Sequence, residues 1–174
     1  MRKIYLLMFA LMLCFSMANA QVIEGTVLKS WDGASGSIEI PANVTEIADN
    51  CFYSPAEEDP DTWEVIGEEK SNTNITNIKL NNVKKIGKNA FKGCSNIESI
   101  DAPNVEIVGD EAFARCEKLA TLALPNIKNV GVDVFQGCEK LKEIALGKSH
   151  TTISGNSFKN CKSLTTISLE NGGG

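Results

Sequence analysis

Four Phe-x-x-Cys pairs recur along this chain at an almost constant interval, and no other feature constrains its fold as strongly. Successive Phe residues are 22, 22 and 23 residues apart in the pairs Phe91/Cys94, Phe113/Cys116, Phe135/Cys138 and Phe158/Cys161. A regular interval of this length indicates a solenoid, in which one supersecondary unit is stacked on copies of itself. Phe52 occupies the same position in an earlier copy. The interval predicts the architecture but not what the protein binds.

Each repeat begins with a short alternating segment, clearest at residues 121–124. Leu122 and Leu124 point to one side and Thr121 and Ala123 to the other, as in a strand with one buried face. Equivalent strands should pair in parallel. After this segment come two apolar residues three positions apart and then a glycine, and we expect the chain to bend sharply at the glycine. The next segment, with a small residue, Phe and Cys, is expected to form one helical or 3-10 turn that directs Phe and Cys into the core.

The pattern resembles the BspA-type leucine-rich repeats of secreted and surface-attached proteins. The match lies in the I-x-x-I-x-L-P strand, the V-x-x-I-G turn and the N-A-F-x-G-C segment, and it covers about residues 38–169. The resemblance implies an α/β, right-handed leucine-rich-repeat solenoid of about five to six repeats of 22–23 residues. A parallel sheet would form one face, and short strands with helical or 3-10 turns the other.

Both ends of the chain depart from the repeat. Residues 21–37, with Val22–Leu28 and a turn at Asp32 and Gly33, are similar to the hairpin that often opens such arrays, and a hairpin would cover the first sheet edge. At the other end, the last expected strand runs into a flexible tail at residues 170–174 without a capping repeat. An uncapped strand leaves an open edge, so we expect either a longer natural chain or a covering partner, with a homodimer through this end as one possibility.

Residues 1–20 have the features of a secretory signal peptide. A charged start at Arg2 and Lys3 precedes an apolar run from Ile4 to Phe15, and Ala18 and Ala20 supply small residues before a cleavage point at Gln21. An uncleaved anchor is the alternative, but the run is short for a membrane span, which needs about 20 apolar residues. We expect a secreted or cell-surface protein with no membrane span after cleavage.

Without residues 1–20 the chain is acidic, with 15 Lys and Arg against 22 Asp and Glu, a net charge of −7. A nucleic-acid partner would require a basic patch, so this partner class is not expected. Five Cys remain, an odd number, and four occupy one position of the repeat. We expect buried free thiols rather than a bridge between neighbouring turns, and still less a metal site, because the thiols of such a ladder do not converge.

The first full repeat is interrupted, because Phe52 and Phe91 are 39 residues apart and 17 of these residues are extra. The insertion, within about residues 53–74, has seven acidic residues but only one basic residue, Lys70, and contains one of the two Trp residues. Three interpretations are open: a mobile solvated loop, a partner contact, or a Ca²⁺ site at Asp59, Asp61 and Glu64, although the spacing fits no established calcium loop. The candidate partner-binding residues here are Asp59, Asp61, Trp63 and Glu64.

The outward-facing residues of the expected sheet form a second candidate surface. They are small polar groups with isolated charges, and they include Asn77, Lys79, Asp101, Thr121 and Glu143. The resemblance makes this face the default interaction surface of a leucine-rich-repeat protein. The strip has no Tyr, Trp or Arg to anchor an interface, so a plain solvated sheet is an equal alternative.

No catalytic arrangement is visible. The single His, His150, lies at an irregular turn with no partner residues, and no phosphate-binding loop or metal-ligand cluster is present. We therefore expect no enzyme activity, cofactor or metal. The leading hypothesis is an exported adhesion or recognition module whose partner is an extracellular or cell-surface protein. The alternatives are a structural segment of a self-assembling surface array and, less favoured, a secreted enzyme inhibitor.

Overall fold

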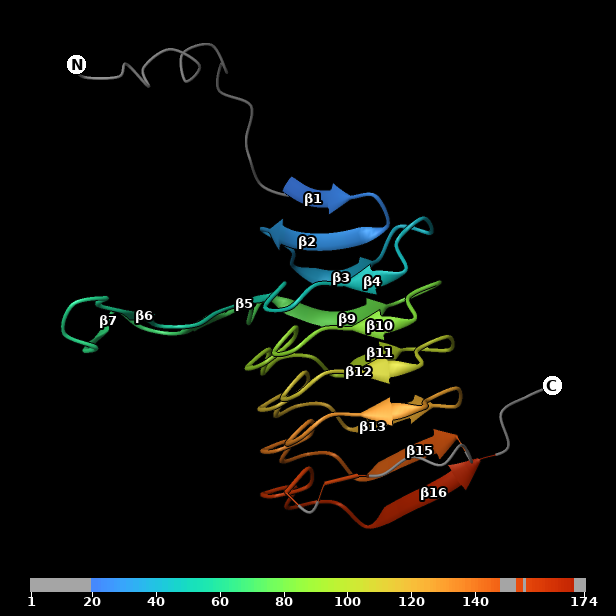
Figure 1. The fold of residues 1–174 in the computed structure, drawn as a ribbon. Coiled ribbons are helices and arrows are strands. Elements are labelled where there is room, and N and C mark those ends of the chain that lie inside the picture. The colour runs from blue at the N-terminus through green and yellow to red at the C-terminus, as the bar shows by residue number, and fades with distance from the viewer. Residues whose placement is uncertain (1–19, 148–152, 155, 171–174) are drawn as a thin grey trace, which may run out of the picture.

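The chain folds into a stack of about six solenoid turns, with an arm that projects from its side (Figure 1). The computed structural model describes residues 20–147, 153, 154 and 156–170. Residues 1–19 of the expected signal peptide, His150, and residues 171–174 of the expected C-terminal tail lie outside these residues. Within the described residues, two six-stranded sheets form the walls of the stack, and the core lies between them.

The first sheet is the one that the alternating segments predict. Its strands lie in the order β16-β15-β13-β11-β9-β3 and all pair in parallel. The inward residues of the central strands are at most 7% exposed, whereas Ala145, expected to face outward, is also buried. The strands are β3 (Gly36–Glu39), β9 (Ile75–Lys79), β11 (Ser99–Asp101), β13 (Thr121–Leu124), β15 (Glu143–Gly147) and β16 (Thr166–Glu170).

The opposite wall is a second sheet, formed by short strands of the kind expected for this face. Its parallel strands lie in the order β2-β4-β10-β12-β14, and all except β2 have two residues. The strands β10, β12 and β14 each include the second residue of a spaced apolar pair that was expected to form a turn. In each strand the second residue points into the core, as Ile47, Ile86 and Val108 do. The strands are β2 (Val27–Asp32), β4 (Glu46–Ile47), β10 (Lys85–Ile86), β12 (Ile107–Val108) and β14 (Asn129–Val130).

The N-terminal hairpin lies at the end of this second sheet. Strand β1 (Ala20–Glu24) pairs antiparallel with β2, and β2 then pairs in parallel with β4. The hairpin therefore turns at Gly25 and Thr26. The chain also turns at Asp32 and Gly33, as predicted, but this turn does not close the hairpin. That segment instead carries the chain across the stack from β2 to β3.

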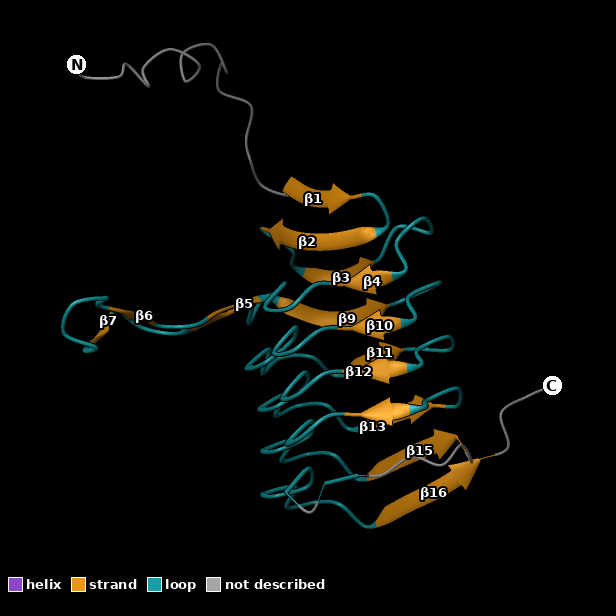
Figure 2. Cartoon of the chain, in the orientation of Figure 1, coloured by secondary structure: helices purple, strands orange, loops and turns teal. Residues whose placement is uncertain are grey.

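The expected helical or 3-10 turns around each Phe are absent. Figure 2 shows strands and loops but no helix among the described residues. We call these corners the Phe turns, residues 50–53, 89–94, 111–116, 133–138 and 156–161. The residue two before Phe has a positive φ in four of them (Asn50, Asn89, Glu111 and Asp133), and the residue two after it in four (Gly93, Arg115, Gly137 and Asn160).

These positive-φ residues explain why the helix prediction failed. A left-handed residue every four positions interrupts any right-handed helix. The backbone groups of the Phe turns are satisfied between turns instead. For example, the N–H of Phe91 donates to the carbonyl of Ala112 at 2.9 Å, and that of Phe113 to Val134 at 3.0 Å. The corner is thus a third line of hydrogen bonds between neighbouring turns.

The Phe side chains form one continuous stack through the core. Ring centroids of neighbours are 5.0–6.0 Å apart with interplanar angles of 7–15°, from Phe52 to Phe158. These values describe near-parallel, offset rings, so of the two geometries expected for such pairs the stack uses the offset one. Phe52 and Phe91 stack at 5.0 Å although the insertion separates them in sequence.

The prediction of buried free thiols is confirmed. The five cysteines among the described residues are free, and all but the half-buried Cys161 are buried. The thiols of Cys116, Cys138 and Cys161 donate to the carbonyl of a Phe in the preceding turn at 3.1–3.3 Å. Burial raises the pKa of the Cys51 and Cys94 thiols to about 12. The cysteines therefore act as small core residues that also satisfy backbone carbonyls.

The glycine after the second-sheet strand has a different role from the one expected. It has no positive φ, so it does not relieve a sharp bend. A Cβ at Gly87 would lie 2.5 Å from the backbone nitrogen of Asp49, and one at Gly131 would lie 2.5 Å from that of Asp110. Glycine is required because the preceding turn of the solenoid lies directly against it.

Replacing a ring in the middle of the stack should destabilise the protein strongly. We expect Phe113→Ala to lower the free energy of unfolding by about 3–5 kcal/mol, because the fully buried ring leaves a cavity. Thr121→Ala, on the exposed face, is the control and should change it by less than about 0.5 kcal/mol. Urea denaturation measures both values, and similar midpoints for the two variants would contradict the assignment of the core.

The cysteines should be poorly reactive in the folded protein. In a chain with Cys14 replaced by Ser, a thiol reagent should modify Cys161 first, since it is the only one of the five that is not buried. Peptide mapping after brief alkylation, with and without denaturant, gives the order. Rapid native-state modification of Cys116 would show that the core is open.

Candidate functional site

The insertion forms a narrow arm, residues 53–74, that projects from the first full turn (Figure 1). At its root, β5 (Tyr53–Ser54) pairs antiparallel with β8 (Lys70–Ser71). Farther out, β6 (Glu57–Glu58) pairs antiparallel with β7 (Val65–Ile66). The arm is thus a two-stranded ribbon rather than an irregular loop.

A tight turn from Asp59 to Glu64 closes the tip of the arm. The carboxylate of Asp59 accepts the backbone N–H groups of Asp61 and Thr62 at 2.8 and 3.1 Å. The N–H of Trp63 donates to the carbonyl of Asp59 at 2.8 Å. The two backbone hydrogen bonds to its carboxylate lower the pKa of Asp59. Asp59 therefore shapes the tip and has less capacity for an outside ligand.

The tip exposes three apolar side chains close together in sequence. Trp63 is 77% exposed, Val65 66% and Ile66 46%. Trp63 also has a φ of 60°, a conformation that is uncommon for a bulky residue. The exposed acidic residues Glu57, Glu58, Asp61, Glu64 and Glu68 belong to the same part of the arm. We call these exposed apolar and acidic residues the arm tip.

The root of the arm is attached to the solenoid by buried and charged groups. Tyr53 is 7% exposed, and its hydroxyl donates to Glu69 at 2.7 Å. Glu69 also forms an ion pair with Arg115, two turns farther along the stack. The ammonium of Lys92 lies 5.2 Å from the centre of the Tyr53 ring and pairs with Glu111 at 2.6 Å. These contacts hold the base of the arm in one position.

The pKa shifts of Tyr53 and Glu69 at the root follow from these contacts. Burial, followed by the hydrogen bond to the Glu69 carboxylate, raises the pKa of Tyr53 to about 12. The Tyr53 hydroxyl and the Arg115 guanidinium lower the pKa of Glu69 below its ordinary value of 4.5. Glu69 is therefore ionised at neutral pH and keeps both partners.

The second candidate surface lies on the outward side of the first sheet, and we call it the outer strip. Lys79, Asp101, Thr121 and Glu143 are exposed on successive strands, and Asn77 is half-buried beside them. Lys79 pairs with Glu39 at 3.1 Å, and Ser99 donates to Asn77 at 2.6 Å. The strip is flat and partly self-paired, and its exposed groups are small or charged.

The structure thus brings one set of candidate residues together at the arm tip and leaves the other on the outer strip. No hydrogen bond or ion pair between described residues joins the two sets. Val65 and Ile66 were not identified from the sequence, although their position two and three residues after Trp63 in the insertion was a usable signal. The anchors Tyr53, Glu69 and Arg115 carried no sequence signal, since Arg115 lies 46 residues from Glu69.

The structure lends no support to the Ca²⁺ interpretation of the insertion. Within the described residues, no group of three or more His, Cys, Asp or Glu side chains is placed to hold a metal ion. The same part of the chain has no helix that is long and apolar enough to cross a membrane.

Comparison with known proteins identifies the repeat. A family model described as a BspA type leucine rich repeat region matches residues 68–172 in six copies. The chain belongs to this family. The resemblance seen in the strand, turn and N-A-F-x-G-C segments is therefore confirmed. No curated protein matches the chain.

Solved structures of bacterial leucine-rich-repeat proteins share the fold. A leucine-rich cell surface protein of Faecalibacterium prausnitzii is 27% identical over 77% of this chain, with a TM-score of 0.59. The leucine-rich repeat protein TpLRR of T. pallidum is 20% identical over 86% (TM-score 0.65), and the pneumococcal vaccine antigen PcpA is 24% identical over 84% (TM-score 0.62). The chain spans 32%, 66% and 34% of the lengths of these three chains.

Removing the charge of Glu69 should loosen the arm without unfolding the solenoid. In Glu69→Gln the ion pair with Arg115 is lost, so backbone amides of residues 54–70 should exchange hydrogen faster, while those of β11 and β13 stay protected. Glu64→Gln, at the tip and without an ion pair, is the matched control. Unchanged exchange in Glu69→Gln would show that the ion pair does not anchor the arm.

The same anchor should depend on pH in a defined direction. Because the pKa of Glu69 is lowered in the folded protein, its stabilising contribution is complete above about pH 4.5 and is lost as the pH falls through the lowered pKa. We expect arm exchange, corrected for intrinsic rates, to rise only below this pH. An increase that begins near neutral pH would contradict the assignment.

Proposed function

We propose that this chain is an exported, non-catalytic protein-interaction module that binds an extracellular or cell-surface protein through its arm tip. The chain's membership of the BspA-type family supports the proposal that it is a repeat module. The similarity of the chain to a cell surface protein of F. prausnitzii supports the proposal that it is exported. The finer statement, adhesion or recognition through the arm, rests on the arm itself. The observation that carries it is the exposed Trp63 on a ribbon anchored at its root.

The backbone conformation of Trp63 is unfavourable for a bulky residue, which calls for a functional explanation. A left-handed φ disfavours bulky residues, and a Gly or Asn would close the same turn with less strain. An indole that is 77% exposed adds no core packing in return. Trp is among the residues that most often dominate binding energy at interfaces. Its presence here is explained by contact with a partner rather than by stability.

The surroundings of Trp63 define the chemistry of the partner. The insertion carries seven carboxylates against the single base Lys70, a net charge of −6. Of these carboxylates, Asp59 is used in the turn and Glu69 at the root. The remaining carboxylates are exposed on the same part of the arm as Trp63. A complementary partner surface has an apolar cleft for the indole and Lys or Arg residues at its rim.

Replacing Trp63 should abolish capture of the partner while the fold is retained. We expect Trp63→Ala to reduce pull-down of extracellular proteins at least tenfold, because a buried indole anchor commonly contributes 2 kcal/mol or more. Replacing residues 56–68 by Asn-Gly removes the tip but keeps Tyr53 and Glu69, so it is a safer deletion than the whole insertion. Capture that weakens with added salt would support a role for the exposed carboxylates.

The matched control is a variant of the outer strip, in which Asp101, Thr121 and Glu143 are all replaced by Ala. It should capture the partner as well as the parent chain does. If this triple variant loses binding while Trp63→Ala keeps it, the outer strip is the site and the proposal for the arm fails.

A second candidate function is self-association through the edge of the first sheet. Among the described residues β16 pairs only with β15, and its Ile167 and Leu169 are 50% and 65% exposed, although the alternation predicts that they face the core. A second copy that covers this edge would bury them. Size-exclusion chromatography with light scattering tests this candidate, and a strictly monomeric protein at high concentration would exclude it.

A further inference from the structure

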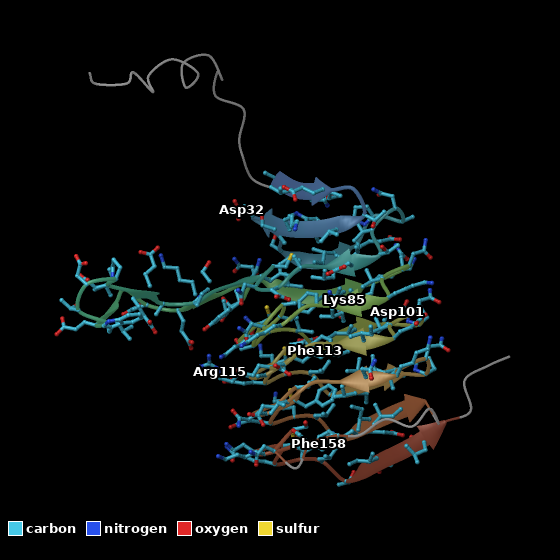
Figure 3. All side chains as sticks on the ribbon, in the orientation of Figure 1. Asp32, Lys85, Asp101, Phe113, Arg115 and Phe158 are labelled. Carbon is cyan, nitrogen blue, oxygen red and sulfur yellow. The ribbon has the colours of Figure 1, made fainter. Side chains whose placement is uncertain are left out.

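A hollow of about 320 Å³ lies at the root of the arm, where the arm meets the crossing from β2 to β3. Three chain segments line it: residues 30–33, residues 50–54 at the start of the arm, and residues 70–74 at its end. Asp32, on the first segment, lies on the side of the molecule from which the arm projects (Figure 3). The hollow is separate from the arm tip.

The walls of the hollow are fixed by hydrogen bonds between these segments. The side-chain amide of Asn72 donates to the carbonyl of Ala34 at 2.9 Å, and its backbone N–H donates to the carbonyl of Phe52 at 2.9 Å. The N–H of Gly36 donates to the carbonyl of Asn74 at 2.7 Å. The hollow is therefore formed before any ligand arrives, as is usual for small-molecule sites.

The lining is polar and electrically balanced. It has one carboxylate, Asp32, and one ammonium, Lys70, and its other polar side chains are amides and hydroxyls. The side chains of Asp32, Ser54 and Asn74 are exposed and make no hydrogen bond to another described residue. Amides and hydroxyls both donate and accept, which matches a ligand whose groups do the same. The balance of charge favours a neutral ligand.

Trp31 supplies the aromatic surface of the hollow. Its ring is half-buried and packs against the core, and its indole N–H is enclosed without an acceptor. An enclosed donor without a partner is unfavourable, so a ligand oxygen that reaches it after a small tilt of the ring would be stabilised. The indole face offers an apolar contact for the C–H groups of a ligand.

We propose that this hollow binds a neutral, hydroxyl-rich ligand, namely a single sugar residue such as the terminal unit of a glycan. Its volume is at the small end of ligand sites, which begin at about 300 Å³, and suits one ring rather than a chain. A peptide is disfavoured, because the carbonyls of Ala34, Phe52 and Asn74 around the hollow are already paired. This site does not depend on the proposed function of the arm tip.

The two Trp residues of the chain allow a direct test with the intact protein. In ¹H–¹⁵N spectra we follow both indole N–H signals while adding methyl glycosides of glucose, galactose, mannose and N-acetylglucosamine. We expect at least one glycoside to shift the Trp31 signal saturably, with a dissociation constant in the range of ~1 mM. The Trp63 signal, from the exposed arm tip, is the internal reference and should not move.

Variants of the rim separate the site from a general effect on the protein. Asn74→Ala should weaken the Trp31 response at least tenfold, because it removes a rim amide that donates and accepts. Asn43→Ala, an exposed Asn on another corner of the same turn, should leave the response unchanged. Trp31→Phe, followed by calorimetry, should also lose binding while far-UV circular dichroism shows an intact fold.

Three results would overturn the proposal. The first is no saturable shift of Trp31 with any of the glycosides up to about 100 mM, far above the expected constant. The second is an equal shift of Trp31 and Trp63, which would indicate a solvent effect. The third is a response of Trp31 to N-acetylalanine methylamide but to no glycoside, which would assign the hollow to a peptide.

Discussion

The structure depends on contacts between neighbouring turns, and the stack of Phe rings is their centre. No single turn can bury its own apolar residues, because its two short strands and its Phe turn enclose the core only from the sides. Each ring covers the next at 5.0–6.0 Å, and both sheets and the Phe turns add backbone hydrogen bonds along the same direction. Stability is therefore a property of pairs of turns.

This requirement for close contact explains the rest of the repeat. Glycine follows the second-sheet strand because the backbone of the preceding turn leaves no room for a Cβ at Gly87 or Gly131. Cysteine is small enough to lie behind each Phe and donates its thiol to the preceding turn, as Cys116 does to Phe91. The insertion is tolerated because it projects from the stack between two successive Phe positions, so the ring of Phe52 still stacks on that of Phe91. The arm can therefore vary without cost to the core.

The arm is a ribbon whose root belongs to the solenoid and whose tip does not. Tyr53 and Glu69 attach the root, whereas Trp63 is held in an unfavourable backbone conformation and exposed to solvent. A stable scaffold of neighbour contacts can support such a tip because the tip contributes nothing to folding. The polar hollow around Trp31 lies at the junction of arm and scaffold, so both candidate sites arise from the one interruption of the repeat.

Much of this fold was predictable, because the same pattern of core residues occurs in each repeat of the sequence. The alternation at Leu122 and Leu124 predicted the first sheet, and the spacing of Phe and Cys predicted the stack and the free thiols. Short strands on the opposite face were expected from the family resemblance, but their positions were missed, since two-residue strands have no measurable period. The lack of helix was missed because positive-φ residues such as Glu111 have no strong signature. At the site, Trp63 was identified by composition, but its anchors were not, because the Glu69–Arg115 pair depends on stacking.

A double-mutant cycle on the Phe stack tests the account most directly. Phe91→Leu and Phe113→Leu, singly and together, give the coupling energy of neighbouring rings, and Phe91→Leu with Phe135→Leu gives that of rings two turns apart. We predict a coupling of about 0.5–1.5 kcal/mol for the neighbours and close to zero for the separated pair. Equal coupling in both cycles, or none in the neighbours, would contradict a fold held together by contacts between adjacent turns.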